Sequence, residues 1–317
     1  MMGNKMENMF LNRLLEIVGE ENVKVDEPMS MHTTFRIGGP ADYFVTPEKK
    51  EQVSEIVTAC KEAGISYYVI GNGSNLLVGD FGYRGLILQI GNKMSELTVE
   101  AVDETHKRVT SGAGLMLSRL ASAVVKESLR GFEFASGIPG TLGGAVAMNA
   151  GAYGGEIKDN IVSAVVMDKT GEILTLTKEE LELGYRTSVI QTQGYIVLEA
   201  TFEFEEGNKE ESTAEIAELT KKRREKQPLE FPSAGSTFKR PEGYFAGKLI
   251  MDCGLRGFRV GNIMVSEKHC GFVINAGGGT AKEALTLIDE VSRRVFEQFG
   301  VNLEPEVRMI GEFYKEK

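Results

Sequence analysis

The segment Gly131–Gly155 reads GFEFASGIPGTLGGAVAMNAGAYGG and contains eight glycines among mostly apolar residues. Such a composition indicates backbone that turns sharply and approaches another group closely, with no side chain in between. A second glycine-rich segment, Ile70–Val78 (IGNGSNLLV), follows a strand-like run at Tyr67–Ile70. Two loops of this kind can aim backbone N–H groups at an anion, so they predict a bound cofactor that carries phosphate. Flexible linkers are the alternative, but linkers are usually polar and rich in serine.

Neither of the common nucleotide-binding fingerprints explains these loops. Gly71-Asn72-Gly73 begins like a dinucleotide fingerprint, but Leu76 occupies the place of the third glycine. The run Leu76–Val78 looks extended, so no helix N-terminus would meet a pyrophosphate there. The pattern G-x-x-x-x-G-K-[ST] does not occur in the sequence, which excludes a P-loop. The sequence therefore argues against both the Rossmann and the P-loop classes.

The composition is that of a soluble globular protein. The 317 residues are enough for two or three domains with a sizeable core, and 42% of them are hydrophobic and 26% charged. A net charge of -10 argues against a general binder of nucleic acid or of membrane surfaces. The sequence contains no apolar run of roughly 18 residues, and its start lacks the apolar core of a signal peptide. We therefore expect a cytoplasmic protein.

Cysteine and histidine do not have the spacing of a metal site. The three cysteines are odd in number and form no C-x-x-C pair, so they indicate core thiols in a reducing compartment. The three histidines are equally scattered along the chain, and we predict no metal. The residues concerned are Cys60, Cys253, Cys270, His32, His106 and His269.

Hydrophobic periodicity predicts an α+β chain. An amphipathic helix falls within residues 1–30, and strands and helices alternate after it. Thr46-Pro47 has the form of an N-cap followed by proline at the first helical position, and Gly64 would end that helix. A later helix is predicted from Thr213 to the next proline.

Changes in composition divide the chain into three predicted parts. The polar and acidic run Glu205–Ser212 is the predicted boundary between the second part and the third. Within the third part, Thr280 and Glu283 have the spacing of a capping box, and Gly300 has the place of a helix C-terminal glycine. The predicted domains are residues 1–95, 96–211 and 212–317.

Three short motifs contain polar residues suited to catalysis. They are GYRTS at Gly184–Ser188, SAGSTFKRP at Ser233–Pro241 and LEPEVRMIG at Leu303–Gly311. Taken singly, each has a structural explanation: a surface arginine, a serine in a glycine turn and a glutamate at a strand edge. Together with the two glycine loops, and in this order along the chain, they form a more specific pattern.

In this order the motifs resemble those of the UDP-N-acetylenolpyruvoylglucosamine reductases, flavoenzymes that make UDP-N-acetylmuramate for peptidoglycan. The resemblance extends from Thr33 to Gly311, and its most specific pieces are IGNGSNLLV, SGIPGTLGGAVAMNAGAYG, YRTS, AGSTFKRP and EPEVRMIG. It implies an α+β fold in which the first two parts form an FAD-binding module of the vanillyl-alcohol-oxidase type. The third part would be a C-terminal α+β substrate-binding domain.

The resemblance implies non-covalently bound FAD, with NADPH as the hydride donor. Enzymes of the family pass a hydride from flavin N5 to the methylene carbon of the enolpyruvyl group, and a proton then joins the neighbouring carbon. The pyrophosphate of FAD would lie against the two glycine loops, in agreement with the phosphate-bearing cofactor that those loops predict. The residues carried over to FAD are Gly71, Asn72, Gly73, Ser74, Asn75, Gly137, Ile138, Pro139, Gly140, Thr141, Gly143, Gly144, Asn149 and Gly151.

Three residues of the short motifs are carried over as catalytic. Arg186 offers a permanently protonated, planar fork to the enolate-like charge that develops beside the substrate carboxylate. Ser236 is the implied proton donor, because a carbanion-like intermediate is basic enough to take a hydroxyl proton when the geometry is right. Glu306 assists, either as a neutral acid that polarises the carboxylate or through a bound water.

Basic residues near these motifs suit a substrate that carries a diphosphate and a carboxylate. Several crowd the end of the helix before Ser233, where Lys221 and Lys222 have the simpler explanation of stabilising their own helix C-terminus. The resemblance carries over Tyr185, Lys226, Arg240 and His269 as substrate-binding residues. The implied partners are UDP-N-acetylenolpyruvoylglucosamine and NADPH, with no nucleic acid and no membrane, and we expect a monomer.

The sequence departs from part of the family in one respect. The segment between Arg186 and Ser236 contains no insertion that could fold as a tyrosine-bearing lid, so the chain resembles the shorter subtype and we predict no lid tyrosine. Two alternatives remain open. One is another oxidoreductase with the same FAD module, which acts on an alcohol or hydroxy acid and often links its flavin covalently through His or Cys. The other is a non-catalytic nucleotide-binding or assembly protein without flavin.

Overall fold

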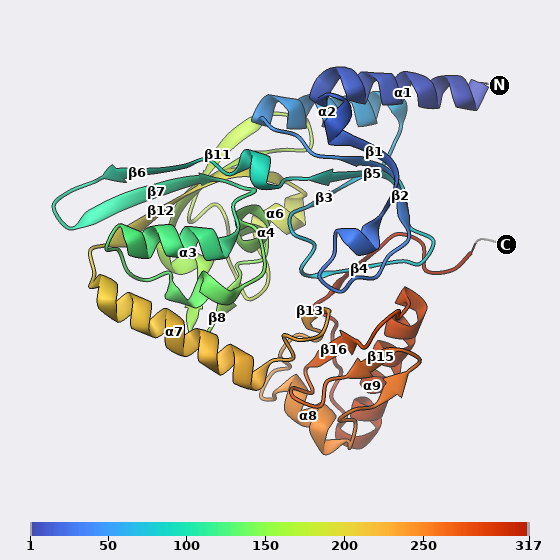
Figure 1. The fold of residues 1–317 in the computed structure, drawn as a ribbon, viewed down its shortest axis with the longest axis vertical. Helices are drawn as coiled ribbons and strands as arrows, with labels where there is room; N and C mark the ends of the chain where they lie inside the picture. The colour runs from blue at the N-terminus through green and yellow to red at the C-terminus, as the bar shows by residue number, and fades with distance from the viewer. Residues whose placement is uncertain (1, 316–317) are drawn as a thin grey trace. The chain divides into compact units, whose positions relative to one another are not determined.

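The computed structural model describes residues 2–315 and divides into two units, each assembled from separated segments of the chain. Figure 1 shows the helices and strands of both units, coloured by residue number. Within the described range, we find no helix with the length and apolar character needed to cross a membrane. The first unit contains the chain up to Lys24, Phe44–Asn72 and Leu86–Lys221, and the second contains Val25–Tyr43, Gly73–Gly85 and the chain from Lys222 on.

Two helices near the start of the chain pack against each other, α1 (Met2–Val18) and α2 (Lys50–Ala63). Phe10 and Leu14 of α1 are buried, which confirms the predicted amphipathic helix. α2 also buries one apolar face and ends, as predicted, at Gly64. The φ angle of Gly64 is 67°, in the left-handed region that glycine adopts without steric strain.

The start of α2 differs from the prediction, which placed its N-cap at Thr46. The N-cap is Lys49 instead. Thr46 is held elsewhere, because its hydroxyl donates to the Asn22 side chain and its N–H donates to the Asn22 carbonyl. The side chain of Gln52 accepts the N–H of Lys49 at 3.2 Å and so satisfies a backbone donor at the helix start.

A four-stranded sheet has the strand order β1-β2-β5-β3. β3 and β5 are parallel, with Tyr67 opposite Leu86. The middle of β5, residues 86–88, is buried, which explains its continuous apolar run. The strands are β1 (Val23–Pro28), β2 (Pro40–Val45), β3 (Tyr67–Ile70) and β5 (Tyr83–Gln89).

A five-stranded antiparallel sheet in the first unit has the order β11-β10-β12-β7-β6. Helix α4 (Leu142–Ala147), inside the glycine-rich segment, packs against β12 and β7 (Figure 1). Phe132 lies edge-on to Phe202 and Phe204 of β12, with ring centres 5.5 and 5.6 Å away. Within this sheet, β6 and β7 form one antiparallel hairpin, and β10 and β11 form another. The strands are β6 (Leu97–Ala101), β7 (His106–Gly112), β10 (Ile161–Met167), β11 (Ile173–Thr177) and β12 (Ile196–Glu205).

Shorter elements connect this sheet to the glycine-rich segment. Helix α3 packs against the short 3-10 helix Glu133–Gly137, and α4 packs against α6. β8 and β9 form a small hairpin. The elements are α3 (Leu117–Lys126), β8 (Gly151–Ala152), β9 (Gly155–Glu156), α5 (Ile157–Asn160) and α6 (Val189–Gln193).

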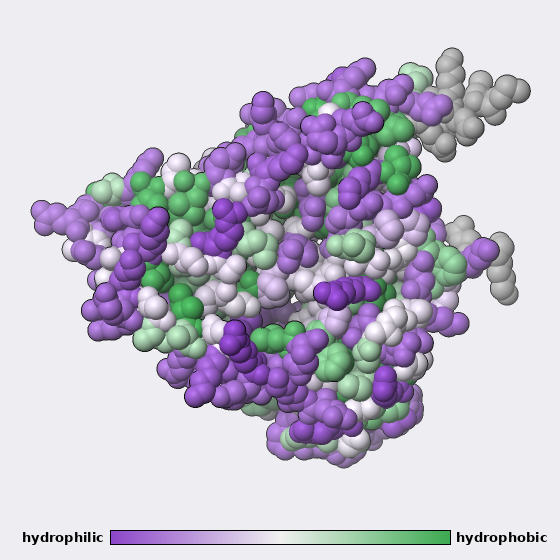
Figure 2. Space-filling view, viewed as in Figure 1, coloured by the Kyte–Doolittle hydropathy of each residue, from purple (hydrophilic) through white to green (hydrophobic). Residues whose placement is uncertain are grey.

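Helix α7 (Lys209–Lys226) begins four residues before the predicted start at Thr213. The earlier start is explained by Asn208, whose side-chain oxygen accepts the N–H groups of Glu210 and Glu211 at 2.9 and 3.1 Å. Ser212 and Leu219 are its buried residues. Figure 2 shows a largely hydrophilic surface over this helix.

The second unit packs a four-stranded sheet, in the order β13-β16-β15-β14, with the helices α8 and α9 around one apolar core. The predicted capping box at the start of α9 is confirmed, because the Thr280 hydroxyl accepts the N–H of Glu283 at 3.1 Å. β4 and β17 pair in parallel, with Leu76 opposite Arg308. The elements are β4 (Leu76–Val78), β13 (Ser233–Ser236), α8 (Ala246–Asp252), β14 (Arg259–Val260), β15 (Ile263–Val265), β16 (Phe272–Asn275), α9 (Ala281–Phe299) and β17 (Arg308–Ile310).

Candidate functional site

The two glycine-rich loops contact each other in the first unit. The side-chain amide of Asn72 donates to the carbonyl oxygen of Pro139 at 2.7 Å. A Cβ atom on Gly71 would lie 2.0 Å from the hydroxyl oxygen of Thr141, so only glycine allows this approach. Two segments recognised separately in the sequence therefore lie together.

The longer loop is held by backbone hydrogen bonds. The N–H of Leu117 donates to the carbonyl of Gly140 at 3.0 Å, and the N–H of Gly143 donates to the carbonyl of Ala113 at 2.8 Å. These bonds fix the loop to the segment between β7 and α3. Such ordering is what a cofactor-binding loop needs, and it argues against a flexible linker.

A cavity of about 120 Å³ lies where the two loops meet. Its walls include Gly71, Thr141 and Gly144 together with apolar side chains such as Ile70 and Val197. Its volume is below the roughly 300–1,000 Å³ of most ligand pockets, so it suits part of a dinucleotide rather than a whole one. A Cβ on Gly144 would meet only the Thr141 hydroxyl, at 3.8 Å, and the glycine therefore leaves open space on this wall. The glycine backbone, the apolar walls and this open space fit a planar, phosphate-bearing cofactor.

The end of the shorter loop belongs to the second unit, where it is tied to the EPEVR motif. Gly73 has a φ angle of 61°, and a Cβ there would lie 2.0 Å from the carbonyl oxygen of His32. The Asn75 side chain donates to the carbonyl of Glu306 at 3.2 Å. The backbone carbonyl of Asn75 accepts the N–H of Arg308. Gly73 is thus required by the packing of the protein itself, and Asn75 positions the backbone of Glu306.

Three predicted site residues of the second unit, Ser236, Glu306 and His269, belong to segments that contact one another. Ser236, at the exposed end of β13, pairs with Phe272, whose ring centre lies 5.0 Å from that of His269. The N–H of Glu306 donates to the carbonyl of Thr237 at 2.8 Å, next to Ser236 in the chain. The AGSTFKRP and EPEVRMIG motifs are therefore neighbours in space.

His269 is held as a neutral ring. Burial lowers its pKa from the ordinary value of 6.5. The N–H of Gly271 donates to Nδ1 at 3.1 Å, so Nδ1 is the unprotonated nitrogen and Nε2 carries the hydrogen. His269 can therefore act as a hydrogen-bond donor through Nε2 without carrying charge.

Arg186 belongs to a tight turn of the first unit. Gly184 and Thr187 pair through their backbones across this turn. The guanidinium donates from Nη2 to the carbonyl of Gly151 at 3.3 Å and lies 5.3 Å from the centre of the Tyr185 ring. Tyr185 itself is 53% exposed. The YRTS motif is therefore anchored to the end of the glycine-rich segment.

Asn149 connects the glycine-rich segment to this turn, an interaction that the sequence did not reveal. Its side-chain amide donates to Glu156 at 2.8 Å and to the carbonyl of Gly184 at 3.0 Å, and its side-chain oxygen accepts the N–H of Lys158. Asn149 is only 1% exposed. Its side chain is thus engaged within the protein, although we predicted it from the resemblance as a cofactor ligand.

The remaining predicted substrate residues lie on the second unit. Lys226 is the exposed last residue of α7. The guanidinium of Arg240 lies 4.0 Å from the centre of the Phe245 ring, a cation–π contact that orients a planar charged group. Phe245 is 59% exposed, so it presents an aromatic face beside this positive charge.

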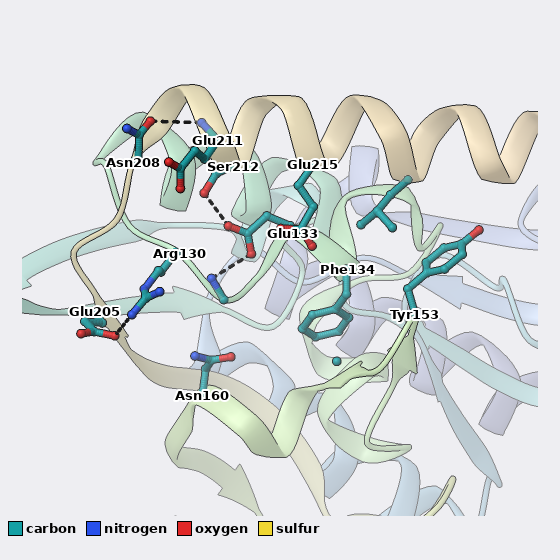
Figure 3. A pocket seen from close by; sticks show the side chains of 13 residues that line it. Arg130, Glu133, Phe134, Tyr153, Asn160, Glu205, Asn208, Glu211, Ser212 and Glu215 are labelled. Atoms are coloured by element: carbon teal, nitrogen blue, oxygen red, sulfur yellow. Dashed lines mark hydrogen bonds and ion pairs between the residues drawn. The ribbon is translucent and has the colours of Figure 1, made fainter.

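A separate polar cavity of about 500 Å³ lies between the start of α7 and the glycine-rich segment (Figure 3). The buried carboxylate of Glu133 accepts the Ser212 hydroxyl at 2.6 Å and the N–H of Gly131 at 2.8 Å. Glu211 and Glu215 also line the cavity. Its carboxylates would repel a diphosphate, and the Ser212–Glu133 contact instead holds the start of α7 against the glycine-rich segment.

Two segments of the chain match models of protein families. Residues 41–177 match the model of an FAD binding domain, and the fold and glycine loops accordingly define an FAD-binding protein. Residues 227–310 match the C-terminal domain of UDP-N-acetylenolpyruvoylglucosamine reductase. A protein of that name from Lachnoclostridium phytofermentans is 58% identical over 97% of this chain and 99% of its own length. The chain belongs to the UDP-N-acetylenolpyruvoylglucosamine reductase family.

Other relatives have the same name. The UDP-N-acetylenolpyruvoylglucosamine reductase of Agathobacter rectalis is 54% identical over 97% of this chain and 100% of its own length. The crystal structure of UDP-N-acetylenolpyruvylglucosamine reductase from Thermus caldophilus has a TM-score of 0.76 and 33% identity, covering 91% of this chain and 98% of that one. The predicted family, the FAD-binding module and the separate C-terminal domain are thereby confirmed.

Proposed function

We propose that this protein reduces the enolpyruvyl group of UDP-N-acetylenolpyruvoylglucosamine to the lactyl group of UDP-N-acetylmuramate with NADPH, in peptidoglycan precursor synthesis. The match to the family over nearly the whole chain carries this proposal. FAD, held by the two glycine-rich loops, would supply the hydride chemistry that links NADPH to the enolpyruvyl methylene carbon. The chain's own residues bind both molecules, stabilise the charge that develops and supply a proton.

FAD would be held without a covalent bond by the two glycine-rich loops. Gly71 and Asn72 of the first loop contact Thr141 and Pro139 of the second, which supports a shared pyrophosphate site. Such loops offer backbone N–H groups to the negative oxygens. Beside them, the apolar cavity that includes Gly144 would take part of a ring system.

Arg186 would act on the charge that appears beside the substrate carboxylate. Addition of a hydride to the alkene places enolate-like charge on the carboxylate oxygens. A guanidinium that is already charged and held in place can stabilise that charge without reorganisation. The bond from Nη2 to Gly151 supports this role, because it restrains the orientation of the fork.

Ser236 would give its hydroxyl proton to the carbon next to the methylene group, and Glu306 would assist. The exposed position of Ser236 at the end of β13 is compatible with direct contact to a substrate. Glu306 is linked by its backbone to Thr237, so a substrate that reaches Ser236 would also be near Glu306. Glu306 would act as a neutral acid or through a bound water.

The substrate would be bound through its phosphates and sugar by Tyr185, Lys226, Arg240 and His269. The stacked guanidinium of Arg240 suits a diphosphate oxygen, and the neutral His269 offers an Nε2 donor. Glycine at position 235, with a φ angle of 78° and open space around a Cβ, supports close approach of this turn to a ligand. We also propose that the chain, of the shorter subtype without a lid tyrosine, is a cytoplasmic monomer that binds no nucleic acid.

An assay of NADPH oxidation tests the proposed function. Purified protein should consume NADPH when UDP-N-acetylenolpyruvoylglucosamine is present, and the sugar nucleotide should gain two hydrogens by mass spectrometry. Omission of the sugar nucleotide is the control, because slow reaction with oxygen also consumes NADPH. Consumption that does not depend on the sugar nucleotide, or a product without the added hydrogens, would contradict the proposal.

A further inference from the structure

We propose that Glu156 is a positioning residue for Arg186, and that it holds the guanidinium in the orientation that substrate reduction requires. The inference rests on the proposed function, in which Arg186 acts on the substrate. Glu156 directly follows the glycine-rich segment and belongs to none of the motifs that predict the site. Four features of its surroundings support the assignment.

The β8–β9 hairpin places Glu156 beside the group that receives the guanidinium. Gly151 of β8 pairs directly with Glu156 of β9, and the Gly151 carbonyl accepts Nη2 of Arg186 at 3.3 Å. A Cβ atom on Gly151 would lie 2.7 Å from the Cγ of Glu156. The glutamate side chain therefore covers the α-carbon of the residue to which Arg186 is bonded.

Asn149 links the carboxylate of Glu156 to the turn that contains Arg186. One side-chain nitrogen donates both to Oε2 of Glu156, at 2.8 Å, and to the carbonyl of Gly184, at 3.0 Å. Because Asn149 is 1% exposed, water cannot easily replace either acceptor. A shift of the Glu156 carboxylate would therefore be passed to the backbone two residues before Arg186.

The negative charge of Glu156 also interacts with the positive charge of Arg186. A hydrogen bond from Lys158, at 2.9 Å, is the largest cause of the lowered pKa of Glu156, with further contributions from Asn149 and from the positive charge of Arg186. The carboxylate therefore stays ionised at neutral pH. Its attraction for the guanidinium opposes rotation of Arg186 away from Gly151.

The backbone around Arg186 needs such support. Arg186 has a φ angle of 55° and Asn149 one of 44°, both in the left-handed region that side chains rarely adopt. Residues in this region persist where the surrounding bonds over-determine the conformation, and such positions concentrate at functional sites. The Asn149–Glu156 contact supplies bonds of this kind.

The variant Glu156→Gln removes the charge but keeps an oxygen that can accept the Asn149 amide. We expect normal FAD content, normal flavin reduction by NADPH and an unchanged thermal unfolding midpoint. Reoxidation of the reduced flavin by the sugar nucleotide should be about ten- to a hundredfold slower, because a small misplacement of a catalytic group has effects of that size. Glu156→Asp, which keeps the charge, should recover part of the rate.

The matched control is Lys158→Gln, which removes the partner of Glu156 and leaves both the carboxylate and the backbone bond to Asn149 in place. Its rates should equal those of the unmodified protein. Because Glu156 acts through Arg186, the double variant Glu156→Gln/Arg186→Ala should be no slower than Arg186→Ala alone. Binding of UDP-N-acetylmuramate to the oxidised protein, followed by calorimetry, should weaken in Glu156→Gln and not in Lys158→Gln.

Several results would overturn the inference. Loss of FAD or of folding in Glu156→Gln would show a structural role, and so would equal slowing of both half-reactions. Additive effects of Glu156→Gln and Arg186→Ala would show that Glu156 acts independently, and an unchanged Glu156→Gln would show that its charge does not matter. If the unmodified protein itself fails to reoxidise with the sugar nucleotide, the proposed function fails, and calorimetry then decides the positioning role alone.

Discussion

Ser236 has the most specific proposed role of the site residues, because it would donate the proton that completes the reduction. It lies at the exposed end of β13, and the carbonyl of the next residue, Thr237, accepts the N–H of Glu306. A hydroxyl in this place can reach a ligand without opening the core of the second unit. Ser236 could be a simple turn residue or the proton donor. Only the effect of substituting Ser236 on turnover distinguishes the two interpretations.

Replacement of Ser236 by alanine separates these interpretations. The change removes one exposed oxygen, so folding, FAD content and substrate affinity should change little. Product formation should fall by about 10²–10⁴-fold, the usual contribution of a general acid. Ser236→Cys, which keeps a transferable proton, should retain more activity than Ser236→Ala. Near-normal turnover of the alanine variant, measured by product formation, would assign the proton to water or to another side chain.

His269 should make stability depend on pH. Because burial lowers its pKa from 6.5, the unfolded chain binds a proton at a pH where the folded protein does not. The free energy of unfolding should therefore decrease as the pH falls through about 6.5, and level off below the lower folded pKa. Urea unfolding from about pH 7.5 to 5 measures this slope. In His269→Gln the slope should become flatter, and equal slopes for the two proteins would show that His269 is not the titrating group.

At the scale of elements, the short helix α4 places glycine backbone along a cavity wall. Gly144 has helical neighbours on both sides, and a Cβ there would have space within the protein. Glycine in a helix is less stable than alanine by about 0.5–1 kcal/mol, so the protein alone gives no reason for this residue. A ligand that lies against the backbone would give one.

Gly144→Ala therefore tests the cofactor loops without disturbing them. The variant protein without FAD should be as stable as the unmodified protein or more stable, whereas its affinity for FAD should fall by at least about tenfold. Thermal unfolding and flavin titration measure the two quantities. Gly91→Ala is the control, because a Cβ there meets only the Gln89 side chain at 3.8 Å. Unchanged FAD affinity in Gly144→Ala would remove this wall from the cofactor site.

Helices and strands marked by a local sequence pattern were predictable from the sequence. Helix ends that depend on hydrogen bonds to other parts of the chain were not. The capping box of α9 is a local pattern, and it is present as predicted. The predicted start of α2 was wrong because Thr46 is hydrogen-bonded to Asn22, which lies more than twenty residues earlier in the chain. α7 starts early because Asn208 acts as its cap, and an asparagine in a polar run has no distinctive pattern.

In the candidate site too, some features were predictable from the sequence and others were not. Glycine loops and short motifs are visible in sequence because their residue types are unusual for their surroundings. The contact of Asn149 with Glu156 was not predicted, because a single hydrogen bond between two side chains leaves no periodic pattern in the sequence. The left-handed backbone conformation of Asn149 was not predicted either. The roles of Arg186, Ser236 and Glu306 came from a resemblance, and they stay predictions.

At the scale of the whole molecule, an acidic chain has to bind anionic ligands. The net charge of -10 repels a nucleotide diphosphate at long range, so binding depends on local donors. Backbone N–H groups of the glycine loops and the stacked guanidinium of Arg240 are donors of this kind. The family match covers nearly the whole chain and therefore includes residues of both units.

The most direct test of the central claim follows the flavin of the purified protein without oxygen. Each chain should contain one FAD, which denaturation should release because no covalent bond holds it. NADPH should bleach the flavin absorbance, and UDP-N-acetylenolpyruvoylglucosamine should restore it while UDP-N-acetylmuramate forms in equal amount. A flavin that stays with the denatured chain, or a reduced flavin that the sugar nucleotide does not reoxidise, would contradict the account.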